Sequence, residues 1–292
     1  MKLSRLYGSG KFGLSFEIFP PKTLEGDVAL MRAVQELATF APSFISCTFG
    51  AGGSTRDQTL ELICRIRDRF RVPVAAHRTC VESSVGEIRT WLKRACDLGI
   101  ENVVALRGDP PRGTAVFQPP RDGLAHANEL VELVRREFPH LGIAVAGYPE
   151  THREAPSPEV DLSNLKRKAE AGADVVLTQL FYENADFFDF RRRYLAAGIQ
   201  VPLVPGILPV TSLTQVERIT TLCGARIPAS LRVELEAHRD DPEGQAAVGV
   251  AYATRQCQEL LESGIPGLHL YVLNKAEAPA KILRALRLSS PA

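Results

Sequence analysis

Short runs of β-branched and aromatic residues recur at a nearly regular interval along the chain. They predict strands over residues 14–19, 44–49, 72–80, 102–107, 143–148, 175–182, 202–208 and 268–274. Between these runs, apolar residues repeat with helical spacing and charged residues occupy the opposite face, as at Leu60, Ile63, Ile66 and Phe70 or at Leu162, Leu165, Ala169 and Ala173. The pattern predicts that strands and helices alternate through the whole chain.

Eight such strand and helix units, each of about 30 residues, are typical of an α/β (β/α)8 TIM barrel. The gap 209–267 is too long for one helix, so we expect an additional helical segment at 228–239 between strands seven and eight, before a helix at 243–263. A doubly wound sheet also alternates strand and helix, but residues 19–22 (FPPK) lack the glycine fingerprint usual after its first strand. No linker divides the chain, and residues 1–292 are expected to form a single catalytic barrel domain.

Composition narrows the class of protein. Of 292 residues, 45% are hydrophobic and 24% charged, as in globular proteins, and the formal net charge of +1 gives no global attraction for nucleic acid or a membrane surface. The six cysteines never form a C-x-x-C pair, so we expect no metal site and buried, reduced thiols. Without a signal peptide or a long apolar run, the protein is expected to be cytoplasmic.

Polar side chains gather where the predicted strands end, and in a barrel these carboxyl ends form one rim. Strand alternation points Glu17 into the barrel mouth, where partial burial is expected to raise its carboxyl pKa. The other rim candidates are Ser46, Thr48, His77, Arg107, Asp109, Tyr148, Glu150, Gln179, Tyr271, Asn274 and Lys275. Each alone also fits a structural role, such as an ion pair for Glu17 or a core position for His77. Together they indicate a site for a polar substrate or cofactor.

The predicted helix after the fifth strand carries Asp161, Asn164, Arg167 and Lys168 on one face. This pattern fits an ordinary solvated helix face. It also fits a dinucleotide site, in which Arg and Lys neutralise phosphate while Asp and Asn hold sugar hydroxyls.

Several motifs resemble those of one enzyme family, in family order and across nearly the whole chain. They are FEIFPPK (16–22), CTFGA (47–51), ALRGDP (105–110), GYPETH (147–152), NLKRK (164–168), PGILPV (205–210) and YVLNK (271–275). On these residues the chain is similar to the bacterial, FAD-dependent 5,10-methylenetetrahydrofolate reductases.

The resemblance implies an oxidoreductase of one-carbon metabolism and methionine biosynthesis. It implies a flavoprotein that reduces 5,10-methylenetetrahydrofolate to 5-methyltetrahydrofolate by a ping-pong mechanism with NADH or NADPH, between which the sequence does not decide. A homodimer or homotetramer fits the family. Because the sequence ends just after the last expected helix, we expect no regulatory domain of the kind that eukaryotic relatives append.

The resemblance also implies roles for individual residues. Glu17 would be the general acid, and Asp109 would lie beside the flavin ring and the pterin. Substrate contacts would come from Glu17, Asp109, Gln179, Gln215, Tyr271 and Lys275. FAD contacts would come from Thr48, Phe49, Ala51, His77, Arg107, Gly108, Asp109, Ala127, Tyr148, His152, Ala155, Asp161, Asn164, Arg167 and Lys168.

Four positions depart from the family pattern. Phe49 and His126 stand where Tyr is frequent, Ile219 where a Phe can stack on ligand, and Lys275 where Arg is expected. Two other classes of function stay open. An aldolase or phosphate-binding barrel would need a Schiff-base lysine in a strand or a Gly-rich loop late in the barrel, and neither is evident. A non-catalytic flavin or folate-binding protein would not need Glu17.

Overall fold

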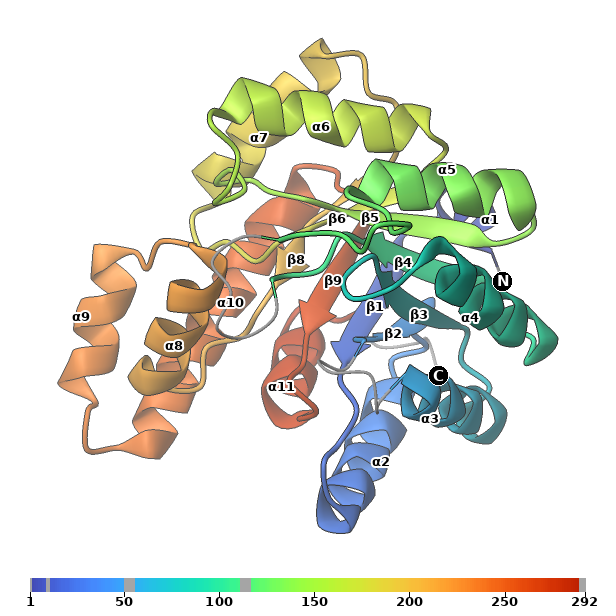
Figure 1. The fold of residues 1–292 in the computed structure, drawn as a ribbon. Helices are drawn as coiled ribbons and strands as arrows, with labels where there is room; N and C mark the ends of the chain where they lie inside the picture. The colour runs from blue at the N-terminus through green and yellow to red at the C-terminus, as the bar shows by residue number, and fades with distance from the viewer. Residues whose placement is uncertain (1, 9–10, 50–55, 111–116, 289–292) are drawn as a thin grey trace.

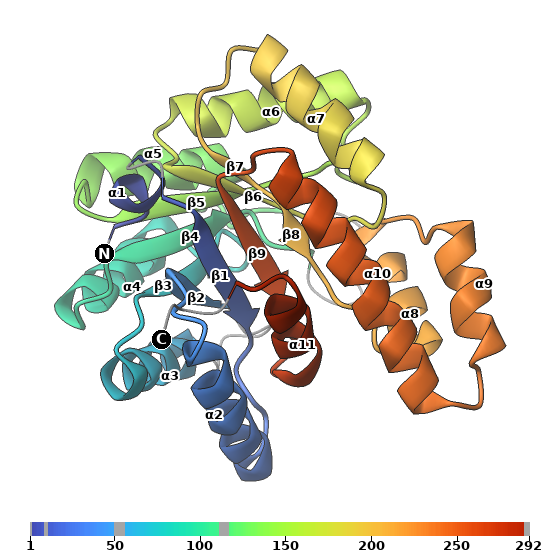
Figure 2. The same cartoon turned by 180° about the vertical axis from the view of Figure 1, so that it is seen from behind.

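A computed structural model describes residues 2–8, 11–49, 56–110 and 117–288 as one parallel sheet surrounded by helices (Figures 1 and 2). The sheet order is β7-β6-β5-β4-β3-β2-β1-β9-β8. The strands are β1 (Gly13–Ile18), β2 (Phe44–Cys47), β3 (Val74–Thr79), β4 (Asn102–Leu106), β5 (Gly142–Gly147), β6 (Val175–Thr178), β7 (Leu203–Val204), β8 (Gly206–Ile207) and β9 (Gly267–Tyr271). The predicted (β/α)8 barrel is confirmed.

The predicted seventh strand differs from the expectation, because Pro205 divides it. Proline has no N–H to give to a ladder, and the chain changes partner at this residue. Val204 before it pairs with Leu177 of β6, and Ile207 after it pairs with Leu270 of β9. This short segment therefore connects β6 with β9 and closes the barrel.

The helices follow the strands around the barrel, and the additional segment before α10 is confirmed. In Figures 1 and 2, α8 and α9 stand off the barrel beside α10. The helices are α1 (Leu3–Gly8), α2 (Leu24–Ala38), α3 (Arg56–Phe70), α4 (Val85–Asp97), α5 (Ala127–Glu137), α6 (Pro158–Glu170), α7 (Asn184–Ala196), α8 (Leu213–Cys223), α9 (Ala229–Ala237), α10 (Pro242–Glu262) and α11 (Glu277–Ala285).

Helix starts agree with local sequence. Ser157 and Asp241 cap α6 and α10, and each is followed by a proline at the first helical position, where its fixed φ suits the helix. In α4, the side chains of Ser84 and Glu87 each accept a hydrogen bond from the other's backbone N–H, which forms a capping box. The N-cap residue alone contributes about 1 kcal/mol to the stability of a helix.

Two apolar layers hold the barrel. The larger lies between strands and helices and contains the predicted positions Leu60, Ile63 and Ile66. The smaller fills the barrel interior with side chains such as Phe44 and Val104, and the short helix α1 belongs to it. Because α1 packs there, the amino end of the barrel is covered (Figure 2). The sequence pattern had not predicted this helix.

The cysteines form no disulfides among the described residues. All six cysteines are free, as expected. Cys47, Cys80 and Cys257 are buried, whereas Cys64, Cys96 and Cys223 are only partly buried, so the expectation of burial holds for three of the six. No helix in the described ranges is both long and apolar enough to cross a membrane.

Gly206 provides a test of how the barrel closes. A Cβ at this position would overlap the Thr178 carbonyl oxygen and lie 2.7 Å from Cε2 of Tyr271. Gly206→Ala should therefore lower the free energy of unfolding by about 1–3 kcal/mol, the usual cost of overpacking, measured by urea denaturation. Gly86→Ala in α4 is the control, because a Cβ there meets nothing closer than 3.9 Å. Equal stability of the two variants would contradict this account of closure.

Candidate active site

A cavity of about 1890 Å³ opens at the carboxyl ends of the strands. This exceeds the 300–1,000 Å³ typical of a small-molecule pocket, so it has room for more than one ligand. Seventeen of the predicted site residues line it: Glu17, Thr48, Phe49, His77, Arg107, Gly108, Asp109, Ala127, Tyr148, His152, Ala155, Asp161, Asn164, Arg167, Lys168, Gln179 and Tyr271.

Three predicted site residues are not among those that line the cavity. Ala51 lies outside the described residues. Lys275 is exposed after β9. Gln215 lies in the first turn of α8, where its side-chain oxygen accepts hydrogen bonds from the backbone N–H and the hydroxyl of Thr211 at 2.8 and 3.0 Å.

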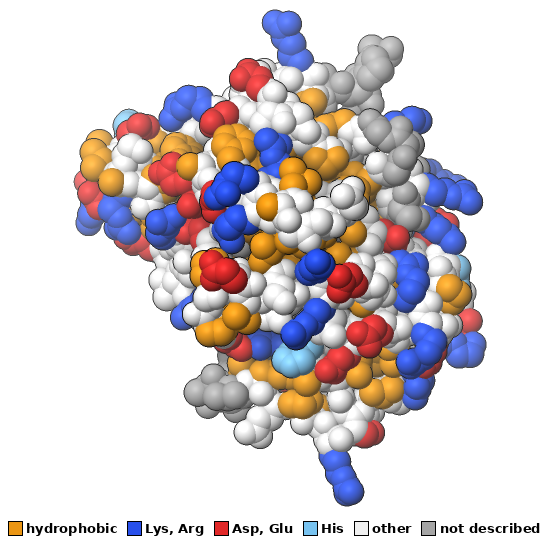
Figure 3. Space-filling view, turned by 90° about the horizontal axis from the view of Figure 1, so that it is seen from above, with side chains coloured by type: hydrophobic (Ala, Val, Ile, Leu, Met, Phe, Trp, Pro, Cys, Tyr) orange, Lys and Arg blue, Asp and Glu red, His pale blue; other side chains and the backbone are white. Residues whose placement is uncertain are grey.

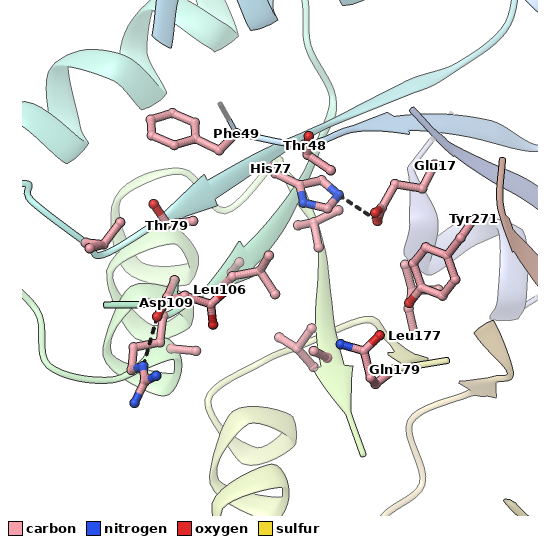
Figure 4. Close-up of a pocket in the computed structure, with 18 of the residues that line it drawn as sticks. Glu17, Thr48, Phe49, His77, Thr79, Leu106, Asp109, Leu177, Gln179 and Tyr271 are labelled. Atoms are coloured by element: carbon pink, nitrogen blue, oxygen red, sulfur yellow. Dashed lines mark hydrogen bonds and ion pairs between the residues drawn. The ribbon is translucent and has the colours of Figure 1, made fainter. Parts of the chain in front are cut away.

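Glu17 points into the cavity from β1 and faces His77 (Figure 4). A second histidine, His269, also faces it. Oε2 of Glu17 lies 3.3 Å from Nε2 of His77 and 3.7 Å from Nε2 of His269. Burial alone would raise the pKa of Glu17, but charge on His77 and hydrogen bonding from both imidazoles outweigh it and lower the pKa to about 2. The expected raised pKa is therefore wrong, because the sequence pattern did not reveal both facing imidazoles.

His269 is the residue that the sequence analysis missed. It is fully buried on β9, and its Nδ1 lies 2.8 Å from the Ser15 hydroxyl oxygen. Its ring stacks on Phe44 at 6.2 Å and meets Tyr271 edge-on at 5.1 Å. A signal was present, since residues two apart on a strand share a face and Tyr271 had already been placed at the rim.

Asp109 follows β4 on the other side of the cavity from Glu17 and Tyr271 (Figure 4). The residue before it, Gly108, has φ +89°, and a Cβ there would lie 2.9 Å from Val81. Only glycine accepts both conditions without strain. The tight backbone therefore fixes where the Asp109 carboxylate projects.

The α6 face contributes Asp161, Asn164, Arg167 and Lys168 to the wall of the same cavity. The Lys168 ammonium group donates to the Ala146 carbonyl at 2.5 Å. Burial lowers the pKa of Lys168 to about 8, although Asp161 opposes this shift. The donor set fits a dinucleotide: a partly buried lysine and an arginine face the cavity beside carboxylate and amide acceptors.

Between β5 and α6 the chain makes a strained turn. Thr151 has φ +74°, which is unusual for a β-branched residue and marks a conformation held by its surroundings. The turn places the His152 ring edge-on against Tyr148 at 4.7 Å, and Asp161 accepts the His152 backbone N–H at 2.9 Å. Tyr148 and His152 are thereby held at the cavity wall.

The positions that depart from the family pattern fall in different places. Phe49 and His126 line the cavity, whereas Ile219 packs at the edge of the apolar cluster formed by α8 and α9. The Arg78 guanidinium lies 5.0 Å from the Phe49 ring centroid and 5.4 Å from that of Trp91. These contacts fix Phe49 at the exit of β2.

Some of the predicted rim residues form structural hydrogen bonds and do not line the cavity. Glu150 accepts from the backbone and the side chain of Arg226, each at 3.0 Å. Asn274 exchanges two hydrogen bonds with the backbone of Phe19, at 2.8 and 3.0 Å. Within the cavity, Arg107 pairs with Glu154 at 2.5 Å. On the outside, Lys, Arg, Asp and Glu side chains are interspersed (Figure 3), and no single-sign field covers that face.

Comparison with solved structures supports the fold. A protein from Clostridium thermocellum, described as binding two copies of 5-methyl-5,6,7,8-tetrahydrofolic acid, matches with a TM-score of 0.66 over 97% of each chain. The sequence identity is only 18%, so this likeness bears on the fold alone.

Comparison with sequences identifies the family. The chain is 38% identical to methylenetetrahydrofolate reductase (NADH) 1 of Arabidopsis thaliana, but spans about half (50%) of that relative's length. It is 38% identical to 5,10-methylenetetrahydrofolate reductase of Escherichia coli, over 95% of this chain and 91% of that one. A family model for methylenetetrahydrofolate reductase matches residues 2–287. The chain therefore belongs to the methylenetetrahydrofolate reductase family.

Proposed function

We propose that the protein reduces 5,10-methylenetetrahydrofolate to 5-methyltetrahydrofolate with NADH or NADPH, through bound FAD and in a ping-pong sequence. The observation that carries this proposal is the placement of two carboxylates, Glu17 and Asp109, on opposite sides of one large cavity (Figure 4). The substrate needs a proton on a ring nitrogen and hydride on its methylene carbon, and two separated sides suit these two needs.

The cavity wall at α6 would hold the cofactor. Arg167 and Lys168 would bind its phosphates, and Asp161 and Asn164 its sugar hydroxyls. When bound, FAD would supply hydride transfer from the nicotinamide to the methylene carbon. Asp109 would lie beside the flavin ring and accept hydrogen bonds from the pterin amino group.

Glu17 would act as the general acid toward the substrate nitrogen. The two facing imidazoles hold its pKa low against the effect of burial, so the carboxylate is ionised. Substrate binding would have to bring a proton to Glu17, since only the protonated carboxyl can donate.

The geometry disfavours the aldolase alternative. Such an enzyme needs a lysine in a barrel strand to form a Schiff base, and no strand within the described residues contains lysine. A non-catalytic flavin or folate binder shares the same cavity, and turnover separates it from the enzyme.

Glu17→Gln should separate the two half-reactions. Glutamine keeps the shape and the hydrogen bonding but cannot deliver a proton. Flavin reduction by nicotinamide should stay within a few-fold of wild type. Oxidation of the reduced flavin by methylenetetrahydrofolate should slow by about 10²- to 10⁴-fold, the usual contribution of general acid catalysis, in anaerobic stopped-flow measurements.

The control for this change is Glu137→Gln, which also removes a carboxylate, on α5 where it pairs with Arg89 at 2.7 Å. It should leave both half-reactions unchanged. Equal slowing of both half-reactions by Glu17→Gln would indicate damage to flavin binding. Slowing of neither would leave Glu17 a structural residue.

FAD retention should depend on the α6 face. Changing Arg167 and Lys168 to Ala should weaken FAD binding by roughly tenfold or more for each contact, because a hydrogen bond to a charged group is worth roughly 1.5–3 kcal/mol. Fluorescence titration of the flavin-free protein with FAD measures this. Unchanged affinity in the double variant, or FMN as the extracted flavin, would overturn the assignment.

The Lys168 contact also predicts a pH dependence. Burial lowers the pKa of Lys168 to about 8, and bound phosphate should raise it. Above pH 8, FAD binding must therefore take up a proton, so affinity should fall by up to about tenfold per pH unit as pH rises, and stay level below pH 8. Lys168→Met should bind FAD more weakly at pH 7 and lose this slope.

Asp109→Asn tests the proposed position of Asp109 beside the flavin ring and the pterin. A negative charge beside the flavin disfavours the anionic reduced form, so its removal should raise the midpoint potential. Folate binding should weaken by roughly tenfold, because a charged hydrogen-bond acceptor is lost. A potential at or below that of wild type, measured at fixed pH, would contradict the placement of Asp109.

A further inference from the structure

Helix α8 reaches the cavity through one side chain in its last turn. Of the residues of α8, all of which the structure describes, Leu222 alone lines the cavity. Gln215, the α8 residue for which the family resemblance implies a folate contact, lies two turns earlier, and its side chain bonds Thr211 instead. The contribution of this helix to the cavity therefore comes from a residue that the sequence analysis did not consider.

Leu222 is an apolar side chain that is left open at the cavity wall. It is 69% exposed. A single exposed leucine on an outer surface is ordinary, but one on a cavity wall can be covered by an apolar part of a ligand, which is favourable. The ligand chemistry that suits Leu222 is a flat ring with an apolar face. Both reactants of the proposed reaction have one, in the aryl ring of folate and the nicotinamide ring.

The last turn of α8 receives little support from apolar packing. The buried residues of the helix are Leu213, Val216 and Thr220, and the three residues after them are exposed or only partly buried. In Figures 1 and 2, α8 and α9 stand off the barrel. The position of Leu222 therefore depends in large part on polar contacts.

Arg153 makes these contacts at the end of α8. Its Nη1 donates to the carbonyl oxygens of Thr221 and Leu222, each at 3.0 Å. Carbonyl groups in the last turn have no partner within their helix, and the helix dipole favours a cation there. The C-cap residue Gly224 has φ +81°, and a Cβ on it would lie 2.8 Å from Cγ of Arg153. Glycine thus allows the arginine to lie directly against the helix end.

The chain around Arg153 is also part of the wall proposed for the cofactor. The residues on either side of it, His152 and Glu154, both line the cavity. The same turn contains Glu150, which accepts from the backbone and the side chain of Arg226, just beyond α8. The end of α8 is therefore attached at two points to the turn that carries cofactor residues.

We propose that Leu222 contacts the reactant that binds beside the cofactor, and that Arg153 is the positioning residue that holds Leu222 at the cavity. The inference rests on the proposed function for the identity of the reactants. In a ping-pong sequence, nicotinamide and folate occupy the space beside the flavin in turn, so either ring can cover Leu222.

Binding without turnover tests the contact. The two probes are folic acid and NAD⁺, neither of which reacts with the oxidised protein, and equilibrium dialysis measures their dissociation constants. Leu222→Ser should weaken the binding of at least one probe by about tenfold, the change expected when a ligand no longer covers about half of a leucine side chain. The probe that is affected identifies the ring.

Leu195→Ser is the matched control for this change. Leu195 is 61% exposed on α7 and does not line the cavity, so its replacement should leave both dissociation constants unchanged. FAD affinity, measured by fluorescence titration, should stay within about twofold of wild type in Leu222→Ser, because the residue is expected to touch the reactant and not the cofactor.

Arg153→Met tests the positioning role. Methionine keeps an apolar stem of similar length but donates no hydrogen bond. The variant should weaken the same probe by roughly 2- to 12-fold, the equivalent of one hydrogen bond, and Arg153→Lys, which keeps a cationic donor, should restore most of the affinity. Arg67→Met is the control, because Arg67 donates in the same way to the Leu98 carbonyl at the end of α4, at 2.7 Å, away from the cavity.

The double variant of Leu222→Ser and Arg153→Met should bind no more weakly than Leu222→Ser alone, because Arg153 acts through Leu222. An additive loss would overturn the positioning role. Unchanged affinity for both probes in Leu222→Ser, an equal loss in Leu195→Ser, or a loss of FAD affinity would overturn the contact. If the probes weaken as expected but Glu17→Gln slows neither half-reaction, the proposed function fails and the contact stands.

Discussion

The in-register pairing of β1 with β9 is the constraint on which the site depends. Side chains alternate along a strand, so a slip of one residue would turn Ser15 and Glu17 out toward the helices and bring Phe16 into the barrel mouth. The pairing of Ser15 with His269 and of Glu17 with Tyr271 prevents this. It brings together groups that lie more than 250 residues apart in the chain.

Closure of the barrel secures that register from the other side of β9. The segment around Pro205 pairs backward with β6 and forward with β9, and the Pro205 carbonyl accepts the His269 N–H at 3.0 Å. The Tyr271 hydroxyl donates to the Thr178 carbonyl at 2.6 Å. The strand that presents His269 is thereby held along both edges.

Burial shifts the pKa values of two cavity residues, Lys168 and Glu17, in opposite directions. At Lys168 it disfavours the charge and lowers the pKa, and a bound anion would restore the charge. At Glu17 it favours the neutral acid, but the facing imidazoles hold the carboxylate ionised. Both groups are therefore poised to change their protonation when ligands replace water, which is common where perturbed groups line a cavity.

The sequence by itself determined the strand and helix alternation, the additional helical segment before α10, and the inward direction of Glu17, because hydrophobic periodicity and strand parity are local properties. Its motifs also determined the family. Only the tertiary structure decided that Pro205 divides a strand, that α1 covers the barrel, and that His77 and His269 share one oxygen of Glu17. These features depend on contacts between distant segments, and local patterns carry no record of which distant side chain lies opposite another.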